Sequence, residues 1–95
     1  MYSYELRKSL EKDFHKLAKK NAEQLKIISK KIKEIVACED VKHYKNLKKP
    51  LQHLKRVHID KSFVLVFSVN EKNKHIIFEE YDHHDKIYKE TFKSV

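Results

Sequence analysis

Two histidines and one arginine supply the residue types needed to break a phosphodiester bond. Arg56 and His58 lie two positions apart in a segment that alternates between apolar and polar residues, so on a strand both project from the same face. His84 lies in a second polar segment, between His83 and Asp85. Histidine suits proton transfer because its unperturbed pKa, about 6.5, is near working pH. If folding brings the two segments together, these residues predict acid–base chemistry on a phosphate.

The matching reaction is cleavage of RNA by its own 2′-hydroxyl. A base removes the hydroxyl proton, cations stabilise the phosphorane, and an acid protonates the departing 5′-oxygen. Asp85 or Asp82, if close to His84, would favour the protonated imidazole that an acid needs. Tyr88 offers a ring on which an unpaired base can stack. The cations that would hold the substrate come from the basic stretch before Arg56, namely Lys48, Lys49 and Lys55.

The same residues allow two alternatives to a catalytic site. His58 and His84 are also compatible with structural or solvated roles on a lysine-rich surface. The run from Asp82 to Asp85 contains zinc-ligand residue types, but adjacent residues seldom converge on one ion and no distant cluster completes a set. We therefore expect neither a metal nor another cofactor.

The charge distribution indicates a polyanionic partner. The 95 residues hold 22 Lys and Arg against 14 Asp and Glu, a formal net charge of +8. Residues 1–61 hold 17 of the basic and 8 of the acidic residues, and the window 42–61 has seven basic residues against one acid. Such a field attracts nucleic acid because each neutralised phosphate releases counterions. The alternative is a solvated lysine-rich surface without a partner.

Length and composition predict one domain spanning residues 1–95, with 40% hydrophobic residues for a small core. The longest apolar run, Phe63–Phe67, is far shorter than the roughly 20 residues that span a bilayer. A single cysteine excludes an internal disulfide framework. The N-terminal residues lack the pattern of a signal peptide, so we expect a cytoplasmic protein with no membrane partner.

Hydrophobic periodicity predicts an α+β fold with the order β-α-α-β-β-β. Apolar residues alternate near the N-terminus and then recur at helical spacing on either side of Asn21, which is expected to cap the second helix with Gln24 in the capping-box position. Three strands follow, expected at Lys55–Ile59, Ser62–Asn70 and His75–Tyr81. The prediction is a curved, mainly antiparallel four-stranded sheet with a helical hairpin on one face and the other face open. With no glycine, turns that need positive φ are expected to use Asn or Asp.

With these elements the chain resembles the RelE/ParE toxin superfamily, specifically its RelE, YoeB and YafQ-like branch. The resemblance covers nearly the whole chain and depends on the order and spacing of short motifs. These are Leu47-Lys48-Lys49-Pro50-Leu51, Leu54–Ile59, the Phe63–Val69 strand and His83–Tyr88.

The resemblance implies a toxin that enters the ribosomal A site and cuts mRNA without a metal, and whose partner antitoxin masks it. It places Arg56, His58, His84 and Tyr88 in the catalytic site, with His83 and Asp85 at its flank. Charge complementarity suggests that the antitoxin is acidic, and we expect it to be helical. One departure concerns the central strand, where an arginine common in the family is replaced by Val64, so Arg56 or a nearby lysine has to support the phosphorane. A ParE-like gyrase poison and a catalytically decayed RNA-binding homologue remain the alternatives.

Overall fold

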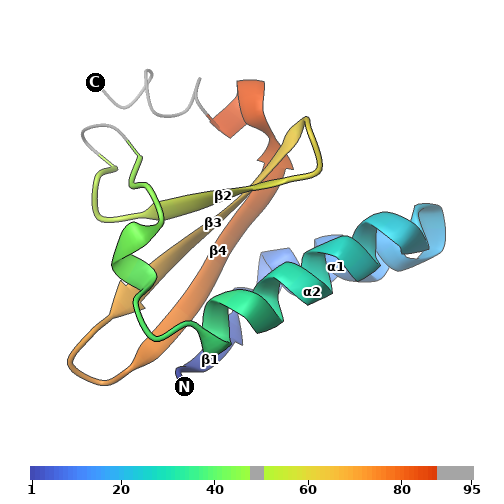
Figure 1. Ribbon diagram of the computed structural model, residues 1–95. Helices are drawn as coiled ribbons and strands as arrows, with labels where there is room; N and C mark the ends of the chain where they lie inside the picture. Colours follow the sequence, from blue (N-terminus) through green and yellow to red (C-terminus); the bar gives the residue numbers. More distant parts are fainter. Residues whose placement is uncertain (48–50, 88–95) are drawn as a thin grey trace.

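The computed structural model describes residues 1–47 and 51–87 (Figure 1). The element order matches the predicted β-α-α-β-β-β arrangement, with one additional short 3-10 helix, η1. The elements are β1 (Ser3–Leu6), α1 (Lys8–Lys20), α2 (Ala22–Ala37), η1 (Val41–His43), β2 (Lys55–Ile59), β3 (Phe63–Asn70) and β4 (His75–His83). Among the described residues, no helix has the length and apolar character needed to cross a membrane.

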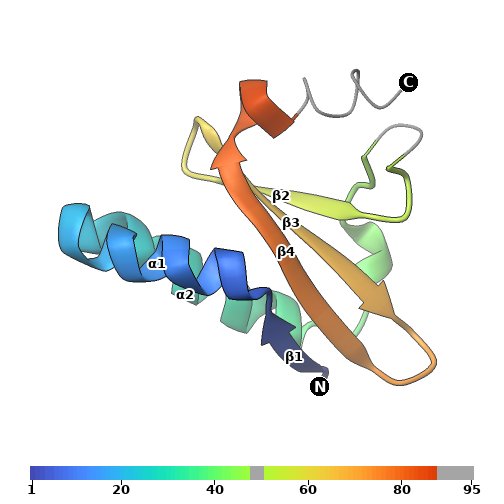
Figure 2. The same ribbon diagram turned by 180° about the vertical axis from the view of Figure 1, so that it is seen from behind.

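The four strands form one sheet in the order β1-β4-β3-β2. Strand β1 runs parallel to β4, whereas β4–β3 and β3–β2 are antiparallel, so the predicted mainly antiparallel sheet is confirmed. Helices α1 and α2 form a hairpin on one face of the sheet, and the strands twist strongly across it (Figures 1 and 2).

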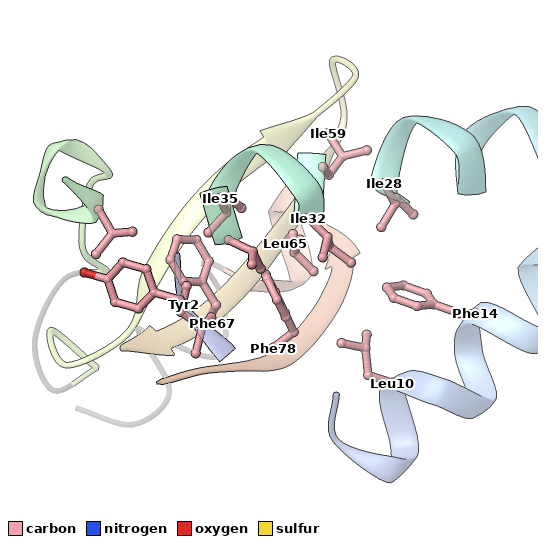
Figure 3. Close-up of a cluster of buried hydrophobic side chains, with 13 residues drawn as sticks. Tyr2, Leu10, Phe14, Ile28, Ile32, Ile35, Ile59, Leu65, Phe67 and Phe78 are labelled. Atoms are coloured by element: carbon pink, nitrogen blue, oxygen red, sulfur yellow. The ribbon is translucent and has the colours of Figure 1, made fainter. Parts of the chain in front are cut away.

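The helices bury the faces that their spacing predicts. Helix α1 buries Leu10 and Phe14, and α2 buries Ile28, Ile32 and Ile35 among its inward residues. These side chains meet the inward residues of β3 and β4, including the fully buried Leu65, Phe67 and Phe78 (Figure 3). The main hydrophobic core therefore lies between the hairpin and the sheet.

Asn21 ends α1 and begins α2 without a glycine. Its side chain accepts a hydrogen bond from the backbone N–H of Gln24 at 3.1 Å, which confirms the predicted N-cap. The reciprocal half of a capping box is absent from this helix start. The Gln24 amide instead donates to the hydroxyl of Tyr81 at 2.8 Å, because Gln24 is buried against β4 and finds its partner there.

The second face of the sheet is not open as expected. Val64 and Val66 point away from the helices and are buried in a separate small core with Leu47 and Ile87, and with Leu51 and Leu54 beside it. Because β3 is apolar on both faces, its outer valines need cover as well. The segments on either side of residues 48–50 and the chain after β4 provide it.

A β-bulge in β4 changes which residues face the helices. Val66 pairs with Glu80 while Phe67 pairs with Phe78, so Glu79 is an extra residue between them. Its carboxylate accepts hydrogen bonds from Arg7 Nε and Ser68 Oγ, each at 2.8 Å. After the bulge, the β4 side chains that face the helices are shifted by one position in the sequence. This shift was not predicted from the sequence.

Two of the described residues take positive φ, both at turns. Asp60, between β2 and β3, has φ 57° and matches the expectation that Asn or Asp serve where glycine is missing. Lys74, between β3 and β4, has φ 53°, and here the expectation was wrong. Its carbonyl accepts a hydrogen bond from Ser3 N–H at 2.9 Å, so pairing with β1 holds the turn in this conformation.

We expect Tyr81→Phe to lower the free energy of unfolding by about 1–3 kcal/mol, because the buried Gln24 amide loses its hydrogen-bond acceptor. Chemical denaturation measures this change. A double variant, Tyr81→Phe with Gln24→Leu, should recover part of the loss because no amide is then left unpaired. A loss equal to the sum of the two single variants would contradict the pairing.

The same hydroxyl gives a pH-dependent readout. Burial is the main factor that raises the pKa of Tyr81, the Gln24 hydrogen bond lowers it, and Asp60 and Asp82 raise it further. The folded state therefore favours the protonated phenol, and this stabilisation is lost as pH rises above about 10. Unfolding midpoints measured through this range should fall less steeply in Tyr81→Phe than in the wild type.

Candidate active site

The second face of the sheet brings the two predicted segments together. Strand β3 lies between β2 and β4, so residues of all three strands line up in rows. Two rows cross this face: Arg56, Val66 and Glu80 in one, and His58, Val64 and Asp82 in the other. With neighbouring strands about 4.8 Å apart, the backbone of His58 is about 10 Å from that of Asp82.

Arg56 and His58 share this face, as predicted from their spacing. Val57 and Ile59 alternate with them and pack in the core under the helices. His58 is exposed and Arg56 is half-buried. The backbone N–H of Arg56 donates to the carbonyl of Lys45 at 2.9 Å, which attaches the preceding loop to the outer edge of β2.

His84 is held at the end of the sheet that carries His58. Strand β4 continues past the predicted end at Tyr81 to His83, and residues 84–87 are helical. The backbone N–H of His84 donates to the carbonyl of Ser62, in the turn between β2 and β3, at 2.9 Å. Figure 1 shows the helical residues after β4 next to this turn. The two histidines therefore lie at one end of the molecule, and neither is beneath the helices.

His84 has a close carboxylate partner. Its Nδ1 lies 2.9 Å from Asp85 Oδ1, and the side chains are 36% and 68% exposed. His83 Nδ1 lies 3.7 Å from the other oxygen of Asp85, and the two imidazole rings are 4.5 Å apart. A carboxylate at Nδ1 orients the imidazole and leaves Nε2 as the nitrogen directed to other chemistry.

The bulge separates His83 from the face that carries His58. His83 follows Tyr81 on the helix side of the sheet, where its ring contacts Phe63 edge-on at 5.7 Å between centroids. His83 thus flanks the candidate site from the other side of the strand end. Asp85 is the residue that links the two imidazoles.

Lys55 lies on the opposite face from Arg56. Its ammonium donates to the carbonyl of Tyr44 at 3.2 Å and to Asn46 Oδ1 at 3.1 Å. These bonds fasten the loop before β2, which gives Lys55 a structural contact where a substrate contact was expected. The expected contacts of Lys48, Lys49 and Tyr88 lie outside the described residues.

Two residues that position the site were not selected from the sequence. Ser62 contributes only a backbone carbonyl, which no side-chain pattern reveals. Ile87 is 2% exposed and packs with Val64 in the small core, so it holds the helical residues after β4 against the sheet. Its apolar character after five polar residues was the available signal. Val64 itself is fully buried, so this position of the central strand contributes packing and no charge.

Sequence comparison places this architecture among known proteins, although no family model matches the chain. A curated protein of Methanocaldococcus jannaschii named "Putative toxin RelE4" is 55% identical over 89 residues, which cover 94% of this chain and 93% of the relative. The chain belongs to the RelE-like toxin family. A second relative, an uncharacterized protein of Methanosarcina mazei, is 57% identical over 88 residues, covering 93% of this chain and all of the relative.

Solved structures share the RelE-like fold at low sequence identity. A metal-bound toxin from Helicobacter pylori superposes with a TM-score of 0.73 at 21% identity, covering 92% of this chain and 99% of that one. The YoeB–YefM complex from Staphylococcus aureus gives 0.70 at 20%, covering 88% and 98%. The RelBE toxin–antitoxin complex from Escherichia coli gives 0.63 at 19%, covering 87% and 96%. The predicted RelE, YoeB and YafQ-like fold is thus confirmed.

Proposed function

We propose that this RelE-like toxin is a ribosome-dependent endoribonuclease that cuts mRNA in the A site. The observation that supports this proposal most strongly is the position of His84, whose backbone is bonded to the β2–β3 turn at the end of the sheet where His58 is exposed. Arg56 lies on the same face as His58, one row away along β2. His58 and Arg56 on β2 would supply the base and the cation, and His84 just after β4 would supply the acid, with β3 between the two strands.

In the proposed reaction His58 removes the proton of the 2′-hydroxyl, and the 2′-oxygen attacks the adjacent phosphorus. The bond from phosphorus to the 5′-oxygen breaks, and His84 gives that oxygen a proton. The products are a 2′,3′-cyclic phosphate and a 5′-hydroxyl, so neither a metal nor an outside reactant is required. Asp85 orients His84 through Nδ1.

The cations of the site would stabilise the phosphorane. Arg56 is the described candidate, because its fork of donors matches the phosphate oxygens. Lys48 or Lys49 would assist it, and Tyr88 would orient the nucleotide. Lys55 would act indirectly, through the loop that its ammonium holds.

The proposed partners are the ribosome with its mRNA and an antitoxin. The RelBE structure is a toxin–antitoxin complex with the same fold, which supports an antitoxin for this chain. Because the chain has a net charge of +8, we infer an acidic antitoxin, with a helical segment that covers the toxin. The proposed site of action is the cytoplasm, where mRNA is translated.

Mapping of mRNA ends on translating ribosomes tests the activity. The purified protein should produce cuts within the A-site codon, and the upstream fragments should end in a 2′,3′-cyclic phosphate. Intact message on ribosomes that have bound the protein would support the decayed RNA-binding homologue, for which the buried Val64 in place of the family arginine is the relevant observation. Loss of gyrase supercoiling with intact message would support a ParE-like poison.

Arg56→Gln should lower the single-turnover cleavage rate about 10²–10³-fold, the usual effect of removing one donor that stabilises the transition state. The matched control is Arg7→Gln, which removes the same charge from a surface ion pair with Glu79. Cleavage by the Arg7 variant should stay close to wild type. Equal rates for the two variants would remove Arg56 from the mechanism.

A further inference from the structure

Three metal-ligating side chains converge at the end of β4. One ligand atom from each of His83, His84 and Asp85 lies within 4.8 Å of the others. We propose that these residues, the β4-end cluster, form a binding site for a divalent transition-metal ion of the zinc class. Neighbouring residues in a chain seldom converge on one ion, and for this reason no metal was expected here. The junction between β4 and the helical residues after it nevertheless brings these three side chains together.

The separations within the β4-end cluster suit such an ion. Bonds of about 2.1 Å to a tetrahedral zinc ion place two ligand atoms about 3.4 Å apart. Asp85 Oδ1 is 2.9 Å from His84 Nδ1, and Asp85 Oδ2 is 3.7 Å from His83 Nδ1. These two distances lie on either side of the required one, and the three ligand atoms lie within 4.8 Å of one another, so side-chain rotations would have to complete the coordination.

The backbone fixes the positions of the three ligands. His83 pairs with Phe63 across the sheet, and the N–H of His84 is bonded to Ser62. The N–H of Asp85 donates to Nδ1 of His83 at 3.3 Å, and an ion bound at this nitrogen would replace that hydrogen bond. A ligand set that is already oriented loses less conformational entropy when it binds an ion.

The donor set selects the class of metal. Two imidazoles and one carboxylate suit Zn²⁺, Ni²⁺ and Cu²⁺, whereas Mg²⁺ and Ca²⁺ prefer sites made of oxygen atoms. The side chains of the cluster are between 36% and 68% exposed, so an ion can enter from solvent. Three protein ligands leave the fourth tetrahedral position to water.

The consequence for activity rests on the proposed function. An ion held by His84 and Asp85 would withdraw the His84 ring from RNA and break its contact with Asp85. Zinc would therefore suppress cleavage by occupying a catalytic residue, and the reaction itself would remain metal-independent. The toxin would be most active when its β4-end cluster is empty.

Titration calorimetry of the full chain with zinc tests the site without any need for catalysis. We expect one ion per chain, and NMR should show the imidazole signals of His83 and His84 shifting together. Asp85→Asn and His83→Ala should weaken zinc binding by more than about tenfold, since loss of even an outer-shell partner costs 10–100-fold. His53→Ala, an exposed histidine in the loop before β2, is the matched control and should bind normally. Absence of saturable binding, or equal affinity in all variants, would overturn the site.

Cleavage assays with and without zinc distinguish the proposed metal site from the proposed ribonuclease function. If the protein cuts mRNA on ribosomes, zinc should slow wild-type cleavage, a chelator should restore it, and Mg²⁺ should not substitute for zinc in this effect. Zinc that binds at the cluster and leaves cleavage unchanged would contradict the inhibitory role. If the protein does not cut mRNA at all, the proposed function fails, and calorimetry still decides whether the site exists.

Discussion

His84→Ala should lower the rate of A-site cleavage by about 10²–10⁴-fold, because each well-placed proton transfer contributes a factor of this size. Its binding to ribosomes should change little, since the side chain acts at the departing oxygen and adds nothing to the basic surface. Single-turnover cleavage on programmed ribosomes gives the rate, and co-sedimentation gives the binding. Slow cleavage with intact binding is the result expected of a residue that acts in the chemical step.

The control for this prediction is His53→Ala, which removes an exposed imidazole from the loop before β2. It should cleave as fast as the wild type. Asp85→Asn should give an intermediate rate because it weakens the orientation of His84 without removing the ring. If His84→Ala cuts mRNA at the wild-type rate, the acid has been assigned to the wrong residue.

Ile35→Ala should destabilise the fold by about 2–5 kcal/mol, the usual cost of a cavity left by a buried isoleucine. Ile35 is fully buried on the face of α2 that packs against the sheet. Ile27 lies on the same helix with 42% of its surface exposed, so Ile27→Ala is a control of identical chemistry. It should leave the stability almost unchanged, since alanine also favours the helix.

Denaturant unfolding of both variants measures this difference. A midpoint shifted in Ile35→Ala and retained in Ile27→Ala would support the orientation of α2. Comparable shifts in the two variants would mean that the hairpin packs on the sheet through a different face of this helix.

The sequence predicted those parts of the fold that depend on local patterns. The spacing of Leu10 and Phe14, and of Ile28, Ile32 and Ile35, reflects the helical period, and each buried face follows directly from it. Asn21 was identified as a cap because its side chain bonds to a backbone group three residues away. The face shared by Arg56 and His58 follows from strand alternation.

Features that depend on distant residues were not predictable in the same way. The bulge at Glu79 occurs where that carboxylate meets Arg7 and Ser68, and no local pattern encodes the meeting. Lys74 takes positive φ because Ser3 bonds to its carbonyl. The cover over Val64 comes from Leu47 and Ile87, which are far from it in sequence.

In the candidate site, too, local patterns were predictable from the sequence and contacts between distant residues were not. The residue types were identified from the sequence, and the approach of the β4 end to β2 was a condition of the hypothesis. The contact that holds the β4 end, from His84 N–H to Ser62, belongs to the backbone. The convergence of His83, His84 and Asp85 depends on the strand ending at His83 and a helical turn beginning at His84.

The parallel pairing of β1 with β4 has a consequence for the order in which the toxin matures. Residues 3–6 find their hydrogen-bonding partners only in residues 75–78, across most of the chain. Contacts between such distant segments form late, because a long loop must close before any of them is gained. During translation the sheet therefore stays incomplete until β4 has left the ribosome, and His84 follows β4. Under the proposed function, the nascent chain would lack a complete site until that point.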